Sequence, residues 1–182
     1  ANMLVCMFAG TARSGVVLRG WEQPAPFSSL PSLCLLGGML AARAGLRTAL
    51  IDKAKFPRDK LCGGGVTGRC RKYLQEVFGQ DLPADSFETR TDIAFSVEGR
   101  AAGGLENAPP LYLTLRCDFD TTLLHWAVEY GATDLTGQII TSIDPDTNNV
   151  NLQNAPSLRA KVLIGADGVN SAVARSLFGQ AF

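Results

Sequence analysis

Apolar and polar positions along the chain predict alternating helices and strands. Alanine, leucine and methionine gather in residues 35–44, which predicts a helix, and Gly45 follows where a left-handed residue would end it. The apolar run 48–51 then predicts a buried strand, closed by Asp52. Helix, glycine, buried strand and terminal acid are typical of the second half of a βαβ unit.

Two further patterns predict an antiparallel portion within this α/β chain. Residues 93–97 and 111–115 alternate apolar and polar positions, as in strands with one face in water. Residues 138–143 and 149–153 predict a hairpin, because the segment between them is rich in aspartate, asparagine and proline.

Helical spacing of apolar residues predicts three more helices, over residues 69–78, 119–130 and 170–178. Asp118 or Asp120 would cap the second of them, because a carboxylate accepts hydrogen bonds from the first free amides of a helix.

Composition excludes several classes of protein. The 182 residues are 46% hydrophobic and 19% charged, which excludes a disordered chain, a collagen-like repeat and a coiled coil. Lysine plus arginine and aspartate plus glutamate both total 17, so no nucleic-acid partner is expected of this neutral chain. The opening apolar run 3–9 is short and has no basic segment before it. It therefore favours a buried strand over a signal peptide and predicts a cytoplasmic protein.

Cysteine and histidine usage limits the chemistry. The five cysteines form no C-x-x-C pair, so neither a disulfide framework nor a metal site is predicted. His125 is the single histidine and lies within a predicted helix, where a structural role is expected. Chemistry would come from a cofactor or from carboxylates, lysines and thiols.

Asp52 is the first candidate for cofactor binding. An acid at the end of the second strand of a dinucleotide fold accepts hydrogen bonds from ribose hydroxyls, although a surface aspartate ending a strand reads equally well. The glycine fingerprint expected roughly 20 residues upstream is missing, because residues 29–34 hold no glycine. Residues 9–15 hold glycines after an apolar strand but lie far upstream, so the phosphate-binding turn is absent or displaced.

The segment 56–65 ends in three consecutive glycines, which let backbone amides approach a flat ring or a phosphate. Arg58 and Lys60 add positive charge that would activate the nearby thiol of Cys62. A flexible linker is the alternative, but linkers seldom carry Phe-Pro and a cysteine beside the glycines.

Residues 165–171 follow a predicted buried strand and open a helix. Asp167 can bond ribose or ribityl hydroxyls there and can cap neighbouring amides. The alternative is an ordinary strand-turn-helix with Asn170 or Ser171 as the cap. Arg116, at the expected end of a strand, would pair with a pyrophosphate or with a neighbouring aspartate.

Taken in order, these segments resemble the geranylgeranyl reductase family of FAD-dependent oxidoreductases, relatives of the aromatic hydroxylases. The resemblance covers roughly residues 36–182 and rests on four segments, 44–53, 56–65, 116–120 and 164–171. The chain departs from the family at the glycine fingerprint, and it ends before the family's second FAD motif.

The resemblance implies an α/β, Rossmann-like FAD/NAD(P)-binding fold with an inserted antiparallel β substrate region, truncated at the C-terminus. Residues 35–83 and 116–182 would form the FAD domain, and residues 84–115 would begin the substrate region. Residues 1–34 would be an atypical N-terminal segment.

The resemblance also implies site residues. Asp52 would hold the adenosine ribose, and Cys62 would be the catalytic candidate, orienting the flavin or the alkene or assisting protonation. The cofactor-binding residues implied are Asp52, Lys53, Cys62, Gly63, Gly65, Arg116, Ile140, Gly165, Asp167 and Gly168.

Members of this family reduce isolated carbon–carbon double bonds of prenyl chains with hydride from reduced flavin. The resemblance therefore implies FAD, with NADPH or ferredoxin as reductant, and a prenyl or other apolar substrate that would bring peripheral contact with a membrane. Two alternatives stay open. One is a flavin monooxygenase of the aromatic-hydroxylase type, and the other is a non-catalytic, truncated remnant.

Overall fold

A computed structural model describes residues 3–8, 32–168 and 171–179 of the chain. The chain divides into two compact units. The first unit comprises residues 1–61 and 120–182, and the second comprises residues 62–119. The second unit thus begins at residue 62, whereas the sequence placed the start of a substrate region at residue 84.

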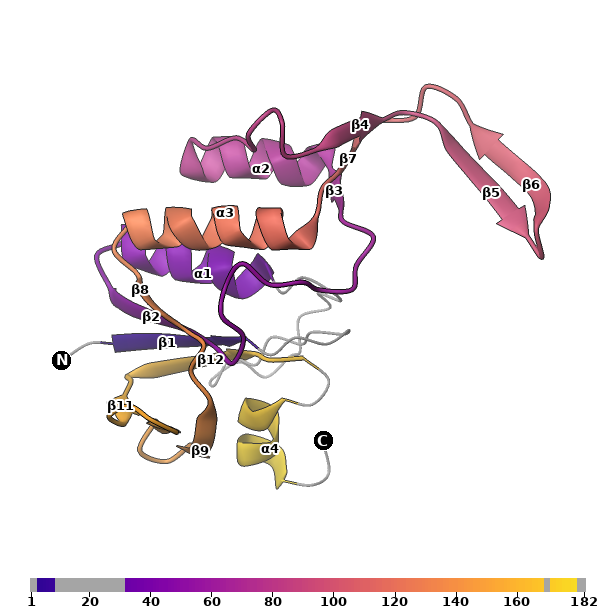
Figure 1. Ribbon diagram of the computed structural model, residues 1–182. Coiled ribbons are helices and arrows are strands. Elements are labelled where there is room, and N and C mark those ends of the chain that lie inside the picture. The colour runs from indigo at the N-terminus through magenta and orange to yellow at the C-terminus, as the bar shows by residue number, and fades with distance from the viewer. Residues whose placement is uncertain (1–2, 9–31, 169–170, 180–182) are drawn as a thin grey trace. The chain divides into compact units, whose positions relative to one another are not determined.

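The first unit is built on a parallel four-stranded sheet in the order β12-β1-β2-β8 (Figure 1). Its strands are β1 (Met3–Phe8), β2 (Arg47–Asp52), β8 (Thr133–Thr136) and β12 (Val162–Ala166). Helix α1 (Ser32–Arg43) connects β1 to β2, and these strands pair in parallel. The unit β1–α1–β2 is therefore a complete βαβ unit, which confirms the element types that the sequence predicted.

The position of β1 changes the interpretation of the missing glycine fingerprint. Residues 32–34 lie within α1, so they are not the turn that precedes it. Residues 9–15 directly follow β1, in the first connection between strand and helix, and they lie outside the described residues. In sequence, residues 9–31 separate β1 from α1, which is more than an ordinary βα connection contains.

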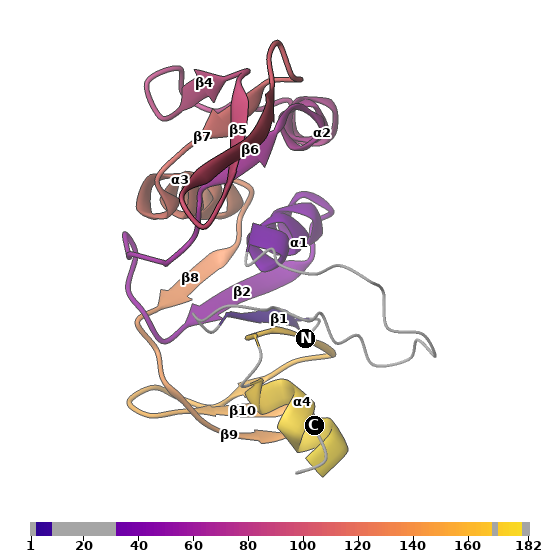
Figure 2. The ribbon, with the colours of Figure 1, turned by 90° about the vertical axis from the view of Figure 1, so that its right-hand side faces the viewer.

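Alternate residues of β2 face opposite sides of the sheet, as the two-residue period of a strand requires. On one side, α1 packs closely on β2, because a Cβ added to Gly38 would lie 2.4 Å from Cδ2 of Leu50. Residues 120–129 of α3 (Arg116–Glu129) lie over the same face (Figures 1 and 2).

The other side of β2 forms the core with a second, antiparallel sheet. This sheet and its neighbouring helix are β9 (Ile140–Asp144), β10 (Asn149–Leu152), β11 (Leu158–Arg159) and α4 (Ala172–Phe178). Ala49 and Ile51 of β2 pack there against Val150, Leu152 and Val173. The predicted hairpin is confirmed, because β9 and β10 pair antiparallel.

Helix α3 begins earlier than its apolar spacing predicts. The N–H of Phe119 donates to the carbonyl oxygen of Leu115 over 2.9 Å, so helical hydrogen bonding already includes residue 115. Asp118 and Asp120 therefore lie inside the helix, and the prediction that one of them caps it is wrong. Arg116 is the first residue of this helix, so its predicted place at the end of a strand is also wrong.

The second unit contains a three-stranded antiparallel sheet, one helix and a separate hairpin. These elements are β3 (Gly65–Thr67), α2 (Gly68–Phe78), β4 (Glu88–Arg90), β5 (Ile93–Val97), β6 (Arg100–Leu105) and β7 (Leu111–Leu113). Thr67 caps α2 by accepting from the N–H of Cys70, and Gly79 ends the helix with a φ of 65°. The helix predicted over residues 69–78 is therefore confirmed.

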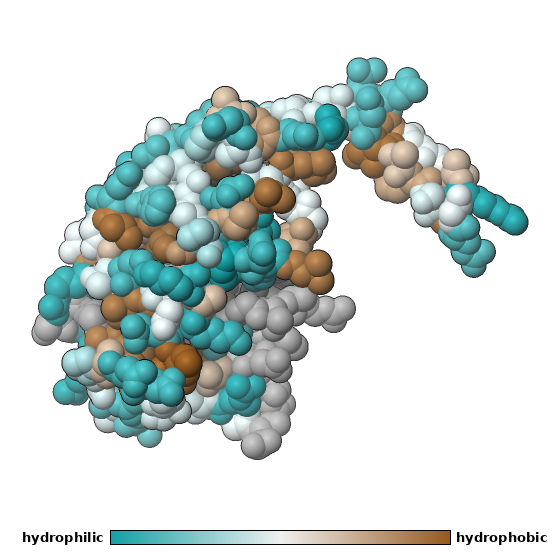
Figure 3. Space-filling view, in the orientation of Figure 1, coloured by the Kyte–Doolittle hydropathy of each residue, from teal (hydrophilic) through white to brown (hydrophobic). Residues whose placement is uncertain are grey.

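The hairpin of β5 and β6 differs from the expected strand with one buried face. Ile93, Phe95 and Val97 are 37%, 54% and 65% exposed, and apolar residues show at the surface of the hairpin (Figure 3). The two strands pair only with each other among the described elements, so no third strand or helix covers the apolar face.

Arg71 and Asp81 form a bidentate ion pair in the second unit, with Nε–Oδ1 and Nη2–Oδ2 distances of 2.6 Å. The guanidinium also stacks on the rings of Phe87 and Tyr112, with its carbon 4.8 Å and 4.7 Å from their centroids. The hydrogen bonds from Arg71 lower the pKa of Asp81 below its ordinary value. The stability of the second unit is therefore expected to depend on the ionised form of Asp81.

This ion pair predicts an acid-sensitive contribution to stability. Because the pKa of Asp81 is lowered by folding, the contribution is complete above the ordinary pKa of about 4 and is lost as the pH falls through the lowered value. Urea unfolding at a series of pH values below 5 should show a smaller loss of stability in Asp81→Asn than in the wild type. Asp85→Asn, at an exposed site, should follow the wild type; equal pH dependence in all three chains would contradict the prediction.

Among the residues that the structure describes, no helix has the length and apolar character needed to cross a membrane.

Candidate functional site

The carboxyl ends of the four parallel strands share one edge of the sheet in the first unit. The register places Phe8 of β1 opposite Asp52 of β2 and opposite Ala166 of β12, and it places Thr136 of β8 opposite Asp52. Asp167 follows Ala166 directly. Open α/β sheets bind their ligands at this edge, so the structure brings two predicted site residues, Asp52 and Asp167, to the expected place.

Asp52 keeps one carboxylate oxygen available in a buried position. The residue is 1% exposed, and Oδ1 accepts a hydrogen bond from the N–H of Ala54 over 2.8 Å. Within the part of the chain that the structure describes, the buried Oδ2 accepts no hydrogen bond, and Oγ1 of the neighbouring Thr136 is likewise buried without one. Burial raises the pKa of Asp52, and the Ala54 N–H and Arg58 act against that rise. Such an acceptor fits the hydroxyl groups of a ribose.

Arg58 is the charged neighbour that the sequence did not assign to Asp52. Its Nε lies 3.4 Å from Oδ2 of Asp52, and its Nη2 lies 3.5 Å from Oδ2 of Asp120. All three side chains are buried, and the guanidinium carbon lies 4.7 Å from the ring centroid of Phe56. The sequence predicted that the charge of Arg58 would activate the thiol of Cys62. This prediction is corrected, because the guanidinium lies between two carboxylates. No local pattern could reveal this contact, since Asp120 comes from a helix far along the chain.

Asp167 has both of its carboxylate oxygens bound to the start of α4. Oδ1 accepts from the hydroxyl of Ser171, and Oδ2 accepts from the N–H groups of Ala172 and Val173 over 2.6 Å and 3.2 Å. Ser171 in turn accepts from the N–H of Ala174 and is the helix cap. Of the two roles predicted for Asp167, the structure displays the capping role.

The other four predicted residues of the first unit each lie in a different setting. Gly165 permits close packing of β12 on α4, because an added Cβ would lie 2.6 Å from Cβ of Val173. Gly168 has a φ of 83°, in the left-handed region that favours glycine. Lys53 is exposed next to Asp52, and Ile140 is half-buried at the start of β9.

Four predicted residues belong to the second unit. Cys62 is exposed, and its Sγ accepts a hydrogen bond from the N–H of Gly64 over 3.5 Å. Gly63 has open space where a side chain would stand, whereas Gly65 opens β3 beside Leu111. Arg116 is 8% exposed. Cys62, Gly63 and Gly65 thus lie together at the start of the second unit, whereas Arg116 begins α3.

Sequence reasoning missed Gly64, the middle glycine of the run 63–65. Its φ is 66°, and an added Cβ would lie 1.9 Å from the carbonyl oxygen of Thr114. The N–H of Thr114 also donates to the carbonyl oxygen of Gly64 over 3.0 Å. The run of three glycines was the available signal, but only the fold shows which of them contacts Thr114, the residue that follows β7.

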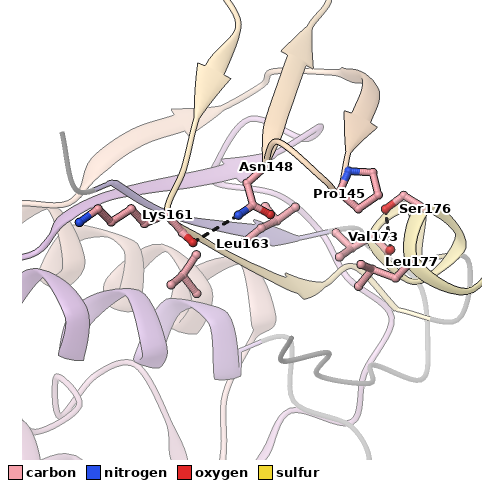
Figure 4. A pocket seen from close by; sticks show the side chains of 8 residues that line it. Pro145, Asn148, Lys161, Leu163, Val173, Ser176 and Leu177 are labelled. Atoms are coloured by element: carbon pink, nitrogen blue, oxygen red, sulfur yellow. Dashed lines mark hydrogen bonds between the residues drawn. The ribbon is translucent and has the colours of Figure 1, made fainter. Parts of the chain in front are cut away.

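One small pocket of about 140 Å³ lies elsewhere in the first unit, between the amino end of β12, the turn after β9 and helix α4 (Figure 4). Drug-sized ligands occupy pockets of about 300–1,000 Å³, so this pocket is too small for a dinucleotide. Its lining residues are Pro145, Asn148, Lys161, Val162, Leu163, Val173, Ser176 and Leu177. None of them is a predicted site residue.

No protein-family model matches the chain. Among curated proteins, it is 28% identical over 152 residues to Protein FixC of Escherichia coli K12, covering 78% of this chain and 36% of that protein. It is 29% identical over 153 residues to menaquinone reductase of Mycolicibacterium smegmatis, covering 75% of this chain and 35% of that enzyme. The chain thus spans about 36% of the length of FixC and a similar share of the reductase.

Solved structures of a halogenase and an oxygenase share the fold. The halogenase PltM in complex with phloroglucinol and FAD superposes with a TM-score of 0.70 at 19% identity, over 97% of this chain and 36% of the halogenase. A variant of 2-methyl-3-hydroxypyridine-5-carboxylic acid oxygenase superposes with a TM-score of 0.68 at 16% identity, over 98% of this chain and 42% of the oxygenase. The chain therefore shares its mixed α/β fold with an FAD-bound flavoprotein, which is consistent with the Rossmann-like fold that the sequence predicted.

Proposed function

We propose that this chain is the FAD-binding part of a flavin-dependent oxidoreductase. The observation that carries the proposal is the buried Oδ2 of Asp52, which has no hydrogen bond from the described residues and lies at the carboxyl end of β2 in a β1–α1–β2 unit. A buried acceptor without a donor is costly, and a ribose hydroxyl would satisfy it.

The residues present fit an adenosine ribose at this edge. Asp52 would accept from a ribose hydroxyl, and the Thr136 hydroxyl, also buried without a hydrogen bond, would bond a second ribose oxygen. The turn of Cys62, Gly63 and Gly65 would line the flavin, as the family resemblance implies. Bound FAD, once reduced, would supply the hydride for a reduction.

For the whole protein we propose the reduction of carbon–carbon double bonds in prenyl chains. The ordered motifs support this proposal, and so does the relative named menaquinone reductase, whose name states an apolar quinone substrate. Cys62 is exposed and could orient the substrate or pass a proton to it. NADPH or ferredoxin as reductant, and peripheral contact with a membrane through the substrate, remain predictions.

Asp52→Asn is expected to weaken FAD binding by at least about tenfold, because a hydrogen bond to a charged acceptor contributes roughly 1.5–3 kcal/mol. The measurement is a fluorescence titration of FAD with the purified chain, with ADP as competitor. Asp85→Asn, at an exposed site in the other unit, is the control and should bind like the wild type. A wild-type chain that binds neither FAD nor ADP would instead support a non-catalytic remnant.

A flavin monooxygenase is the second candidate, because the fold is shared with an oxygenase and a halogenase. The two candidates differ in their products. With reductant and a prenyl substrate, a reductase adds two hydrogen atoms per double bond, whereas a monooxygenase consumes oxygen and inserts an oxygen atom. Mass spectrometry of the product and an oxygen electrode, applied to the full-length protein, separate them.

A further inference from the structure

The guanidinium of Arg58 is buried in the first unit and contacts three side chains. It lies between the carboxylates of Asp52 and Asp120, at 3.4 Å and 3.5 Å, and over the ring of Phe56. Its side chain is 8% exposed, and both aspartate side chains are fully buried. A cation buried to this degree is rare unless it is paired, so its position is well determined by its partners.

The geometry leaves hydrogen-bonding capacity unused at the face toward Asp52. Nε of Arg58 and Oδ2 of Asp52 lie 3.4 Å apart, close enough for attraction, yet neither atom makes a hydrogen bond with any of the described residues. The positive charge of Arg58 thus balances the charge of the Asp52 carboxylate, while Oδ2 keeps the capacity to accept a hydrogen bond. An isolated charge would be costly at this depth, and the nearby cation lowers that cost while Oδ2 keeps lone pairs for a ligand.

We propose that Arg58, tethered by Asp120 of α3, is a positioning residue that neutralises and orients the Asp52 carboxylate so that Oδ2 accepts a ribose hydroxyl. This inference rests on the proposed function. It assigns to the loop after β2 a role in nucleotide binding that acts through Asp52, without contact between Arg58 and the nucleotide.

The first test needs no ligand. Carbon-13 NMR titration of the aspartate side chains follows Asp52 in the wild type and in Arg58→Gln. The charged groups near Asp52 are Arg58 and Lys60 from the loop and Asp120, which Arg58 bridges from α3. Arg58→Gln should raise the pKa of Asp52 by about one unit or more, because burial is then opposed by less positive charge. Arg58→Lys keeps the charge and should reverse most of that rise. An unchanged Asp52 pKa in Arg58→Gln overturns the inference.

The second test is a double-mutant cycle on FAD affinity. Arg58→Gln should weaken FAD binding by about tenfold, and Arg58→Lys should restore most of the affinity. In the Asp52→Asn background, Arg58→Gln should cause no further loss beyond about twofold, because its effect passes through Asp52. A further tenfold loss in the double variant would mean that Arg58 binds the nucleotide itself, and the inference would be wrong.

Thermal unfolding of each variant separates positioning from a general structural role. Equal loss of FAD affinity in Arg58→Gln and Arg58→Lys, with equal falls in the unfolding midpoint, would overturn the inference. Failure of the proposed function looks different, because the wild-type chain would then bind neither FAD nor ADP, and the ligand part of this inference would fall with it. The NMR titration still decides the effect of Arg58 on Asp52 in that case.

Discussion

Replacing Asp167 with alanine should destabilise the first unit by about 3 kcal/mol, because the buried amides of Ala172 and Val173 lose their acceptor at about 1–3 kcal/mol each. The hydroxyl of Ser171 would lose its acceptor as well. The start of α4 would then fray, and Val173 would be held less firmly in the core that it forms with Val150. The effect is expected to be on folding, since both oxygens of Asp167 are already bound to the helix.

Urea unfolding followed by circular dichroism measures this loss. Asp167→Asn keeps one oxygen acceptor and should lose less stability than Asp167→Ala. Asn154→Ala, at an exposed position of the same unit, is the control and should change the free energy of unfolding by less than about 0.5 kcal/mol. If Asp167→Ala unfolds at the wild-type midpoint, the capping role is wrong.

Gly64→Ala should destabilise the second unit by at least about 2 kcal/mol, from the cost of a left-handed alanine together with a backbone clash. The new Cβ would lie 1.9 Å from the carbonyl oxygen of Thr114, which cannot turn away as a flexible side chain could. Relief requires β3 and β7 to separate at this point. The hydrogen bond from Thr114 N–H to the Gly64 carbonyl would then lengthen.

Hydrogen exchange at the Thr114 amide gives a local measurement of this effect, beside the unfolding midpoint of the whole chain. Exchange should be faster in Gly64→Ala than in the wild type. Gly63→Ala is the matched control, because an added Cβ at Gly63 meets nothing within 4 Å. Equal behaviour of the two variants would show that the clash at Gly64 is relieved without cost.

Local patterns predicted most helices and strands of the described chain. The helices expected over residues 35–44 and 69–78 occur as Ser32–Arg43 and Gly68–Phe78, because apolar spacing and a terminal glycine act within a few residues of each other. The sequence also placed Asp52 correctly at the end of a buried strand. These helices and this strand end depend on interactions within short stretches of chain, so the pattern of a single sequence is enough to predict them.

Contacts between distant segments could not be predicted in the same way. Arg58 and Asp120 form an ion pair within the first unit, although residues 62–119 separate them in the sequence, and neither residue belongs to a pattern that includes the other. The alternation in β5 predicted a buried face, but burial depends on a covering element, and Phe95 has none among the described residues. The role of Gly64 likewise depends on Thr114, which comes from a different strand region.

The strand order of the parallel sheet also has a consequence for the order of folding. β1 lies between β2 and β12, so its two neighbours come from opposite ends of the sequence. During synthesis β1 can pair with β2 early, but its other edge stays open until Val162–Ala166 has been made. Such a long-range pairing slows folding and leaves a strand edge exposed meanwhile. Completion of the sheet that carries Asp52 is therefore expected to be a late event in folding, because β12 follows the second unit in the sequence.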